Sequence, residues 1–168
     1  METATTDLRP LRLGLLLLAA TSLPALACTP EDLSAVPLGY NIDYETQVQP
    51  IFDLRCDGCH IGGAFGNLAL DPGASYGNLV NVPADNPAAL RDRVEPGDID
   101  ASFLFRKINC ENLDGALGLR MPRNGPPYLS AVQQAIIMDW INEGAFPLAD
   151  PDRIFGYPFD PRANATPF

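Results

Sequence analysis

The pentapeptide C-D-G-C-H at residues 56–60 constrains the fold of this chain more than any other stretch. It places two cysteines two residues apart and follows them directly with the only histidine of the 168-residue sequence. Three kinds of site use such a pattern: a covalent haem attachment site, half of a zinc site, and a redox-active dithiol. Each of them needs a different surrounding structure, so the remainder of the sequence distinguishes them.

The first 27 residues have the pattern of an export signal rather than of a folded domain. Arg9 and Arg12 form a positive segment, residues 13–23 are an apolar stretch, and A-L-A at 25–27 is typical of a cleavage site. The apolar stretch is shorter than the roughly 20 residues that a membrane-spanning helix needs. We therefore expect the protein to be exported to the periplasm, with residues 1–27 removed as a signal peptide.

Cys28 follows this junction directly, and its position allows two different mature N-termini. The junction is also an imperfect lipobox, because Ala25 stands where leucine is more usual. Acylation of Cys28 would anchor the protein to a bacterial membrane, whereas a plain secreted chain would leave the thiol available for a disulfide. In that second case Cys110 could pair with Cys28, and in either case Cys110 could stay a buried thiol or pair with another chain.

Proline and glycine determine how the mature chain divides. The sequence holds 17 prolines and 14 glycines, which predicts long irregular connections. Residues 28–42 show no periodic apolar pattern and are predicted to be a tether, residues 43–148 a single domain, and residues 149–168 an irregular tail. A domain of this size has a modest core, which a large apolar cofactor at its centre would enlarge. The net charge of −10 argues against nucleic acid as a partner.

Helix signals occur in four segments: 43–56, 76–80, 101–108 and 130–144. Asp43 or Thr46 is expected to cap the first of these helices, and Asp100 the third. Pro50 is compatible with the first helix only in its first turn, where the missing N–H has no partner within the helix. This first helix leads directly into the cysteines of C-D-G-C-H.

The last helix has the clearest boundaries. Ser130 and Gln133 match a capping box, and Gly144 stands where a helix-terminating glycine is expected. No segment alternates convincingly as a strand. The fold class that follows is a small all-α domain whose helices are separated by long loops rich in glycine and proline.

Covalent haem attachment explains C-D-G-C-H best. Two cysteine sulfurs one helical turn apart can add to the two vinyl groups of one haem, and the adjacent imidazole can bind its iron. Cys56 and Cys59 are thus predicted to bind haem c, with His60 as the proximal iron ligand. A zinc site would have to recruit Cys28 or Cys110, which have no paired spacing, and a redox dithiol is expected between a strand and a helix.

The sixth position of the iron then needs a ligand other than a second histidine. The choice is a methionine, a weaker ligand, or an open position. Met138 lies in the middle of the predicted last helix, where methionine usually fills the core. Met121 lies in an irregular loop stiffened by prolines, so we predict that Met121 is the distal ligand.

Four runs occur in order along the chain: QPIFDLRCDGCHIGG, RVEPGDIDASFLFRKI, RMPRNGPPYLS and QQAIIMDWINEGA. Together they resemble the successive blocks of small c-type cytochrome domains of the planctomycete and myxobacterial kind, which are related to class I cytochrome c. The resemblance covers most of residues 43–145, is specific at C-D-G-C-H and R-M-P, and is absent from the tail. It implies a cytochrome c-like helical fold around one covalent haem at Cys56 and Cys59, ligated by His60 and Met121.

Three further residues are candidates for contacts with the haem or with its histidine ligand. Class I cytochromes tend to have a proline roughly a dozen residues after the histidine, whose carbonyl accepts a hydrogen bond from the imidazole. Pro72 stands at about that distance, but D-P-G at 71–73 is equally an ordinary turn, which we favour. Arg120 and Arg123 flank the predicted ligand and could bind the haem propionates, or could be solvated loop arginines.

The function that these features predict is one-electron transfer by a monohaem c-type cytochrome, with redox proteins as partners and no substrate turnover. A thioether ligand favours ferrous iron, and a filled coordination sphere leaves little for oxygen or peroxide to attack. One alternative is a haem enzyme or sensor with an open sixth position, which would lack the usual distal histidine. Another is an electron-passing adaptor subunit of a larger membrane-attached assembly.

Overall fold

The computed structural model describes residues 28–150, so the predicted signal peptide and most of the predicted tail lie outside the described residues. The elements in chain order are η1 (Tyr44–Val48), α1 (Gln49–Arg55), α2 (Asp57–His60), η2 (Phe65–Asn67), α3 (Ser75–Leu79), α4 (Phe103–Asn109), η3 (Gly115–Leu117) and α5 (Ala131–Asn142). Within residues 28–150, β-pairing occurs only as isolated bridges, for example the one between Val80 and Val94. None of the helices in this range has the length and apolar character of a membrane span.

The segment that leads into C-D-G-C-H and through it is helical, but it is divided into three short elements, η1, α1 and α2. Asp43 caps η1, where its side chain accepts a hydrogen bond from the backbone N–H of Thr46. Pro50 lies in the first turn of α1, as its missing N–H requires. The helix is interrupted at Cys56, whose φ of −121° and ψ of −1° separate α1 from α2. Cys56 therefore lies at the junction, and Cys59 lies inside α2.

The helix that we expected to begin after Asp100 begins two residues later. Ser102 precedes the first residue of α4, and its hydroxyl is bonded to the backbone of Glu95 and Asp98 instead of capping the helix. The reason is the turn at residues 96–97, which brings the backbone of Glu95 next to Ser102. The expected short helix around residues 76–80 is α3.

The last helix is confirmed with its cap. The Ser130 side chain accepts from the backbone N–H of Gln133, and the Gln133 side chain accepts from the backbone N–H of Ser130. Gly144 follows the helix with a φ of +104°, a conformation that glycine adopts without strain. The capping pair therefore begins α5 where the sequence predicted it.

Replacing Ser130 with alanine is expected to lower the free energy of unfolding by about 1 kcal/mol, because the backbone N–H at Gln133 loses its acceptor. Urea denaturation followed by circular dichroism measures this loss. Ser130→Asn supplies another side-chain acceptor and is the matched control. Equal midpoints for the alanine and asparagine variants would contradict the capping role.

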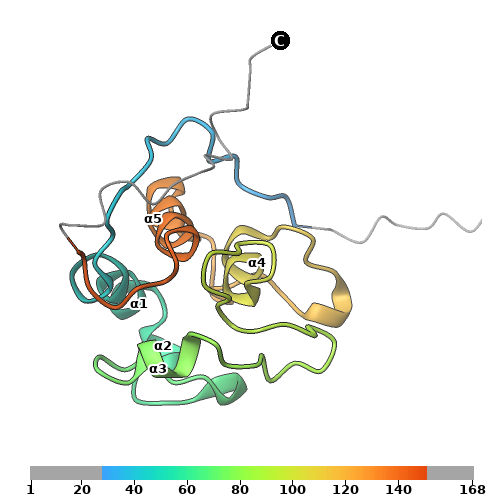
Figure 1. Ribbon diagram of the computed structural model, residues 1–168. Helices are drawn as coiled ribbons and strands as arrows, with labels where there is room; N and C mark the ends of the chain where they lie inside the picture. Colours follow the sequence, from blue (N-terminus) through green and yellow to red (C-terminus); the bar gives the residue numbers. More distant parts are fainter. Residues whose placement is uncertain (1–27, 151–168) are drawn as a thin grey trace, which may run out of the picture.

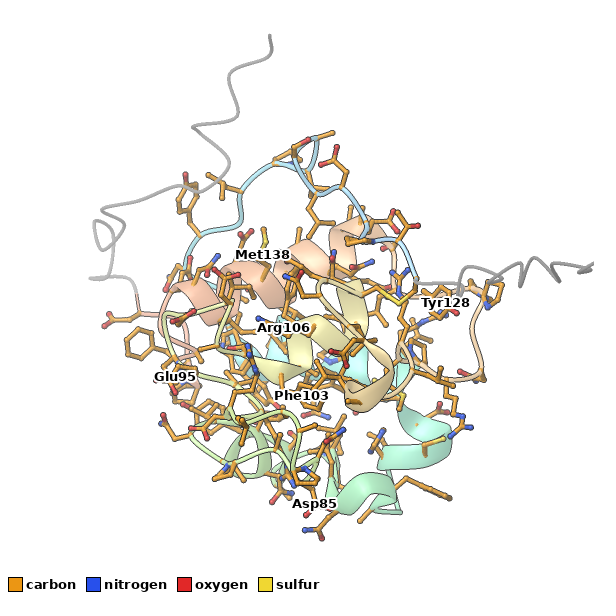
Figure 2. All side chains as sticks on the ribbon, turned by 90° about the vertical axis from the view of Figure 1, so that its right-hand side faces the viewer. Asp85, Glu95, Phe103, Arg106, Tyr128 and Met138 are labelled. Atoms are coloured by element: carbon orange, nitrogen blue, oxygen red, sulfur yellow. A yellow bond between two sulfur atoms is a disulfide. The ribbon has the colours of Figure 1, made fainter. Side chains whose placement is uncertain are left out.

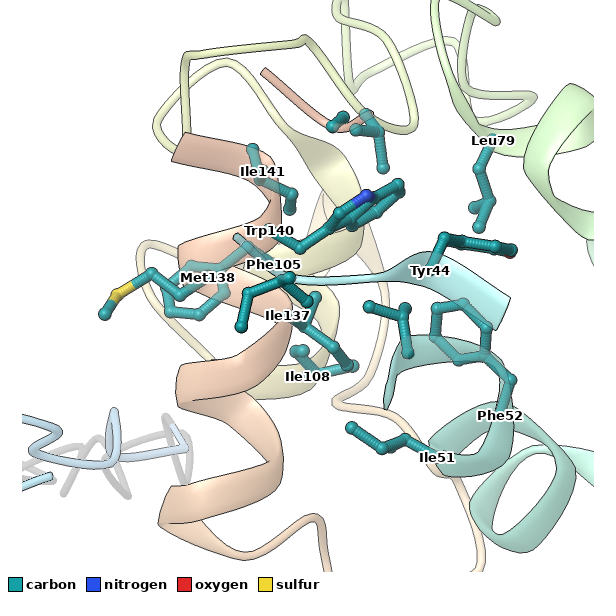
Figure 3. Close-up of a cluster of buried hydrophobic side chains, with 14 of the residues drawn as sticks. Tyr44, Ile51, Phe52, Leu79, Phe105, Ile108, Ile137, Met138, Trp140 and Ile141 are labelled. Atoms are coloured by element: carbon teal, nitrogen blue, oxygen red, sulfur yellow. The ribbon is translucent and has the colours of Figure 1, made fainter. Parts of the chain in front are cut away.

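The core lies between α5, α4 and the helical segment around η1 (Figure 3). Trp140 and Tyr44 are fully buried, with ring centroids 5.0 Å apart, and Tyr76 packs edge-on against Tyr44 at 5.3 Å. Met138 belongs to this cluster with 9 % of its surface exposed, as expected for a methionine that fills the core. Phe105 lies beside it in Figure 3.

The N-terminal segment, residues 28–42, does not have the structure of the tether that we expected. It runs across the molecule past α5, from the side of α4 to the start of η1 (Figure 1). Leu33 and Ile42 are buried, and a disulfide joins Cys28 to Cys110 with Cα atoms 5.9 Å apart. Periodicity gives no sign of this packing, because an irregular segment can be held by hydrogen bonds to side chains far along the chain. One such bond runs from the backbone N–H of Gly39 to Asp139 Oδ2, at 2.7 Å.

Candidate functional site

One cavity brings together the four residues that the sequence predicted as attachment points and axial ligands. Cys56, Cys59 and His60 line it from the end of α1 and from α2, and Met121 lines it from the loop after α4. The cavity has a volume of about 590 Å³, within the range of small-molecule and cofactor sites. Residues that are far apart in the sequence thus contribute to a single concave site.

The wall of the cavity is largely apolar. One face of α4 contributes Phe103, Leu104 and Ile108, and the segment after α2 contributes Leu68 and Leu70, among others. In Figure 2, two of the lining residues are labelled, Phe103 of α4 above and Asp85 of the preceding loop below. A largely apolar wall suits a flat apolar ligand with few polar groups.

His60 is oriented by a carbonyl group, although not by the one that the resemblance suggested. Its Nδ1 lies 2.8 Å from the carbonyl oxygen of Leu68, and its own carbonyl accepts from the backbone N–H of Leu70 at 2.6 Å. Pro72 lies in a turn, the alternative that we favoured. The bond to Leu68 requires the proton on Nδ1, which leaves Nε2 as the ring nitrogen that can bind a metal.

The segment that supplies this carbonyl is itself held from several directions. The carbonyl of Asn67 accepts from Arg93 at 2.8 Å, that of Ala69 from Asn78 at 2.9 Å, and that of Leu70 from Gln49 at 3.0 Å. Gln49 is buried in α1 and also bonds Ser75 of α3. The imidazole orientation therefore depends on α1, α3 and the loop before α4. No local sequence pattern marks these partners.

The two cysteines of the motif are thiols in different environments. Burial raises the pKa of Cys56 to about 12, so this thiol stays protonated at neutral pH, whereas Cys59 is exposed. A redox-active dithiol normally has a cysteine with a lowered pKa. Zinc would need further ligands, but Cys28 and Cys110 are bonded to each other, and residues 28–150 contain no cluster of three or more His, Cys, Asp or Glu. Neither competing interpretation of C-D-G-C-H gains support.

Met121 and Met138 occupy different environments. The Met121 side chain lines the cavity, and its backbone N–H donates to the carbonyl of Lys107 at 2.7 Å, which attaches the loop to α4. Met138 is packed in the core on α5 and does not line the cavity. Of these two methionines, Met121 is therefore the one placed to contact a ligand bound beside His60.

Positive charge surrounds the cavity, although the chain as a whole is acidic. Arg93, Lys107 and Arg123 line it, while Asp85 is its only acidic lining residue within the described range. Burial lowers the pKa of Lys107, and repulsion from Arg123 lowers it further. We did not predict Lys107 as a site residue from the sequence. It lies four residues after Phe103, however, and so shares the apolar face of α4.

Arg123 lines the cavity and Arg120 does not, so the structure separates the two arginines for which the sequence left a propionate contact and a solvated position open. The Nε of Arg120 donates to the carbonyl of Ile108 at 2.9 Å, and its guanidinium lies 4.3 Å from the ring centroid of Tyr128 and 3.9 Å from the Glu31 carboxylate. The physical reason is packing: neighbouring residues of an irregular loop can point to opposite sides. Met121 is turned to the cavity and Arg120 to the N-terminal segment.

No protein-family model, curated protein or solved structure matches this chain. The functional assignment therefore depends on the geometry of the cavity and on the chemistry of the residues that line it.

Proposed function

We propose that this protein is a monohaem c-type cytochrome that transfers single electrons outside the cytoplasm, with His60 and Met121 as axial ligands. One observation carries the proposal: Cys56, Cys59, His60 and Met121 line the same apolar cavity. Two thiols, one imidazole and one thioether are the groups that covalent attachment and six-fold coordination of one haem require. The pairing of C-D-G-C-H with a methionine from a distant loop is not expected for zinc or for a dithiol.

The residues that line the cavity fit a covalently attached haem one by one. Cys56 and Cys59 would hold it through thioether bonds, each formed by addition of S–H across a vinyl C=C bond. His60 would bind the iron through Nε2, because the carbonyl of Leu68 engages Nδ1. When bound, haem supplies an iron that alternates between the ferrous and ferric states. Met121 would fill the sixth coordination position of the iron, which would leave no open position for substrate chemistry.

The charge around the cavity supports an anionic group on the ligand. Burial is the main cause of the lowered pKa of Lys107, and repulsion from Arg123 adds to it. The two propionates of haem would relieve this repulsion and accept charge-assisted hydrogen bonds. Arg93 donates to the backbone carbonyls of Asn78 and Asn67, and Lys107 donates to those of Leu117 and Leu119. Both cations would have to share or exchange these bonds to reach a propionate.

Haem attachment and the disulfide both support a location outside the cytoplasm. Haem c is attached outside the cytoplasm, and the disulfide between Cys28 and Cys110 suits an oxidising compartment. A sulfur that is bonded to Cys110 cannot also carry a lipid thioether, so this structure favours the secreted form over the lipid-anchored one. The partners are redox proteins of unspecified identity.

The test is an absorption spectrum and an extraction of the protein matured with haem. We expect a c-type ferrous spectrum with one haem per chain, and haem that stays with the polypeptide in acidified acetone because thioether bonds survive denaturation. Release of haem would contradict covalent attachment. A ferric spectrum of open-site iron would instead favour the haem enzyme or sensor.

A further inference from the structure

Two arginines attach the loop that carries Met121 to the rest of the domain. Arg55 is the last residue of α1 and precedes Cys56 directly. Its Nη2 donates to the carbonyl of Tyr128 at 3.0 Å and also to the carbonyl of Pro127. The helix that leads into the first cysteine is thus bonded directly to the far end of the loop 120–128, which we call the methionine loop.

The second arginine acts from within the methionine loop. Arg120 precedes Met121 directly, and only 9 % of its side chain is exposed. Its guanidinium lies over the ring of Tyr128, its Nε donates to the carbonyl of Ile108, and its Nη2 is buried without a hydrogen-bond partner. A cation held over an aromatic ring in a desolvated place gives a substantial attraction. Arg120 thereby connects the start of the loop to its end at Tyr128.

Tyr128 also packs directly on the loop backbone. A Cβ atom added at Gly125 would lie 2.5 Å from two carbons of the Tyr128 ring. The glycine therefore permits the ring to lie against the chain between Met121 and Tyr128, where a larger residue would push it away. Figure 2 shows Tyr128 at the edge of the molecule, away from Phe103, and Tyr128 is not among the residues that line the cavity. The contacts of Tyr128 are with the loop and its attachments and not with the cavity.

We propose that Arg55, Arg120 and Tyr128 form a clamp that holds the methionine loop closed against α1 and so keeps Met121 in the cavity. The proposal rests on the proposed function in one respect, the role of Met121 as an iron ligand. The three residues are positioning residues, since they act through the loop. An external ligand can bind the iron only while Met121 is displaced, so its apparent affinity rises in proportion to the fraction of open loop.

The experiment uses the full-length mature protein with haem and two variants that remove the clamp, Arg55→Met and Tyr128→Leu. Imidazole is titrated into the ferric protein, and amide hydrogen exchange is followed at Met121 and Gly125. Loss of a charged hydrogen bond opens the loop, so Arg55→Met is expected to bind imidazole about tenfold to hundredfold more tightly than wild type. Tyr128→Leu should shift the affinity in the same direction, and both variants should exchange these amides faster.

Three matched variants separate the clamp from a general loss of packing. Arg55→Lys keeps a charged donor and should restore part of the wild-type behaviour. Tyr128→Phe keeps the ring under Arg120 and should match wild type. Arg106→Met removes an arginine of α4 that bonds the carbonyl of Asp100 and lies outside the cavity lining, so it should also match wild type.

Faster exchange together with tighter imidazole binding supports the clamp. Wild-type affinity or wild-type exchange in Arg55→Met and Tyr128→Leu overturns it, as does an equal effect of Arg106→Met. If Tyr128→Leu does not fold, Arg55→Met decides alone. If the wild-type spectrum shows no methionine ligation, the proposed ligand is wrong, and exchange at Met121 and Gly125 still decides whether the clamp closes the loop.

Discussion

Replacing Met121 with alanine is expected to abolish the weak red-edge charge-transfer band that methionine-bound ferric haem shows, while haem stays attached through Cys56 and Cys59. The thioether is the soft ligand that stabilises ferrous iron, so its loss should also lower the reduction potential. We expect a fall on the order of 100 mV, a modest part of the roughly 0.8 V range over which axial ligation tunes haem. Absorption spectra and a redox titration of the two proteins measure both effects.

Met138→Leu is the matched control for this experiment. Leucine is close to methionine in volume, so the change in the core of α5 should cost less than about 1.5 kcal/mol of stability and leave the spectrum unaltered. If Met121→Ala keeps the band and Met138→Leu loses it, the ligand assignment is wrong. If neither variant changes the band, methionine ligation itself is wrong.

Removing the disulfide with the double variant Cys28→Ser/Cys110→Ser is expected to lower the free energy of unfolding by about 2 to 5 kcal/mol. The bond closes a loop with a sequence separation of 82 residues, which restricts the unfolded chain strongly. In the folded state it also holds the N-terminal segment, whose Glu31 backbone carbonyl accepts from Asn109 at 3.0 Å. Urea denaturation of both proteins under oxidising conditions measures the difference.

The reduced wild-type protein provides the control, because a reductant should bring its unfolding midpoint down to that of the double variant. Mass spectrometry after alkylation without reductant should find Cys28 and Cys110 unmodified. Equal stability under oxidising conditions would contradict the contribution of the bond. A diacylglyceryl group on Cys28 would show that the lipid-anchored form exists instead.

Much of the candidate site could be predicted because its chemistry is encoded locally. Cys56, Cys59 and His60 are adjacent in the sequence, so their grouping needs no knowledge of the fold. Elimination could also select Met121 over Met138, since the last helix has a capping box and an apolar face that mark Met138 as a core residue. The structure places Met121 and not Met138 in the cavity with His60.

The sequence by itself therefore determined the motif, the ligand candidates and the main helices, because each depends on residues within a few turns of one another. Only the tertiary structure decided that Leu68 and not Pro72 accepts from His60, and that Arg120 points to Tyr128 while Lys107 lines the cavity. It also decided that residues 28–42 pack on the domain. Such choices depend on where irregular loops meet distant helices, and loop direction is determined by packing and hydrogen bonds that have no periodic signature in the chain.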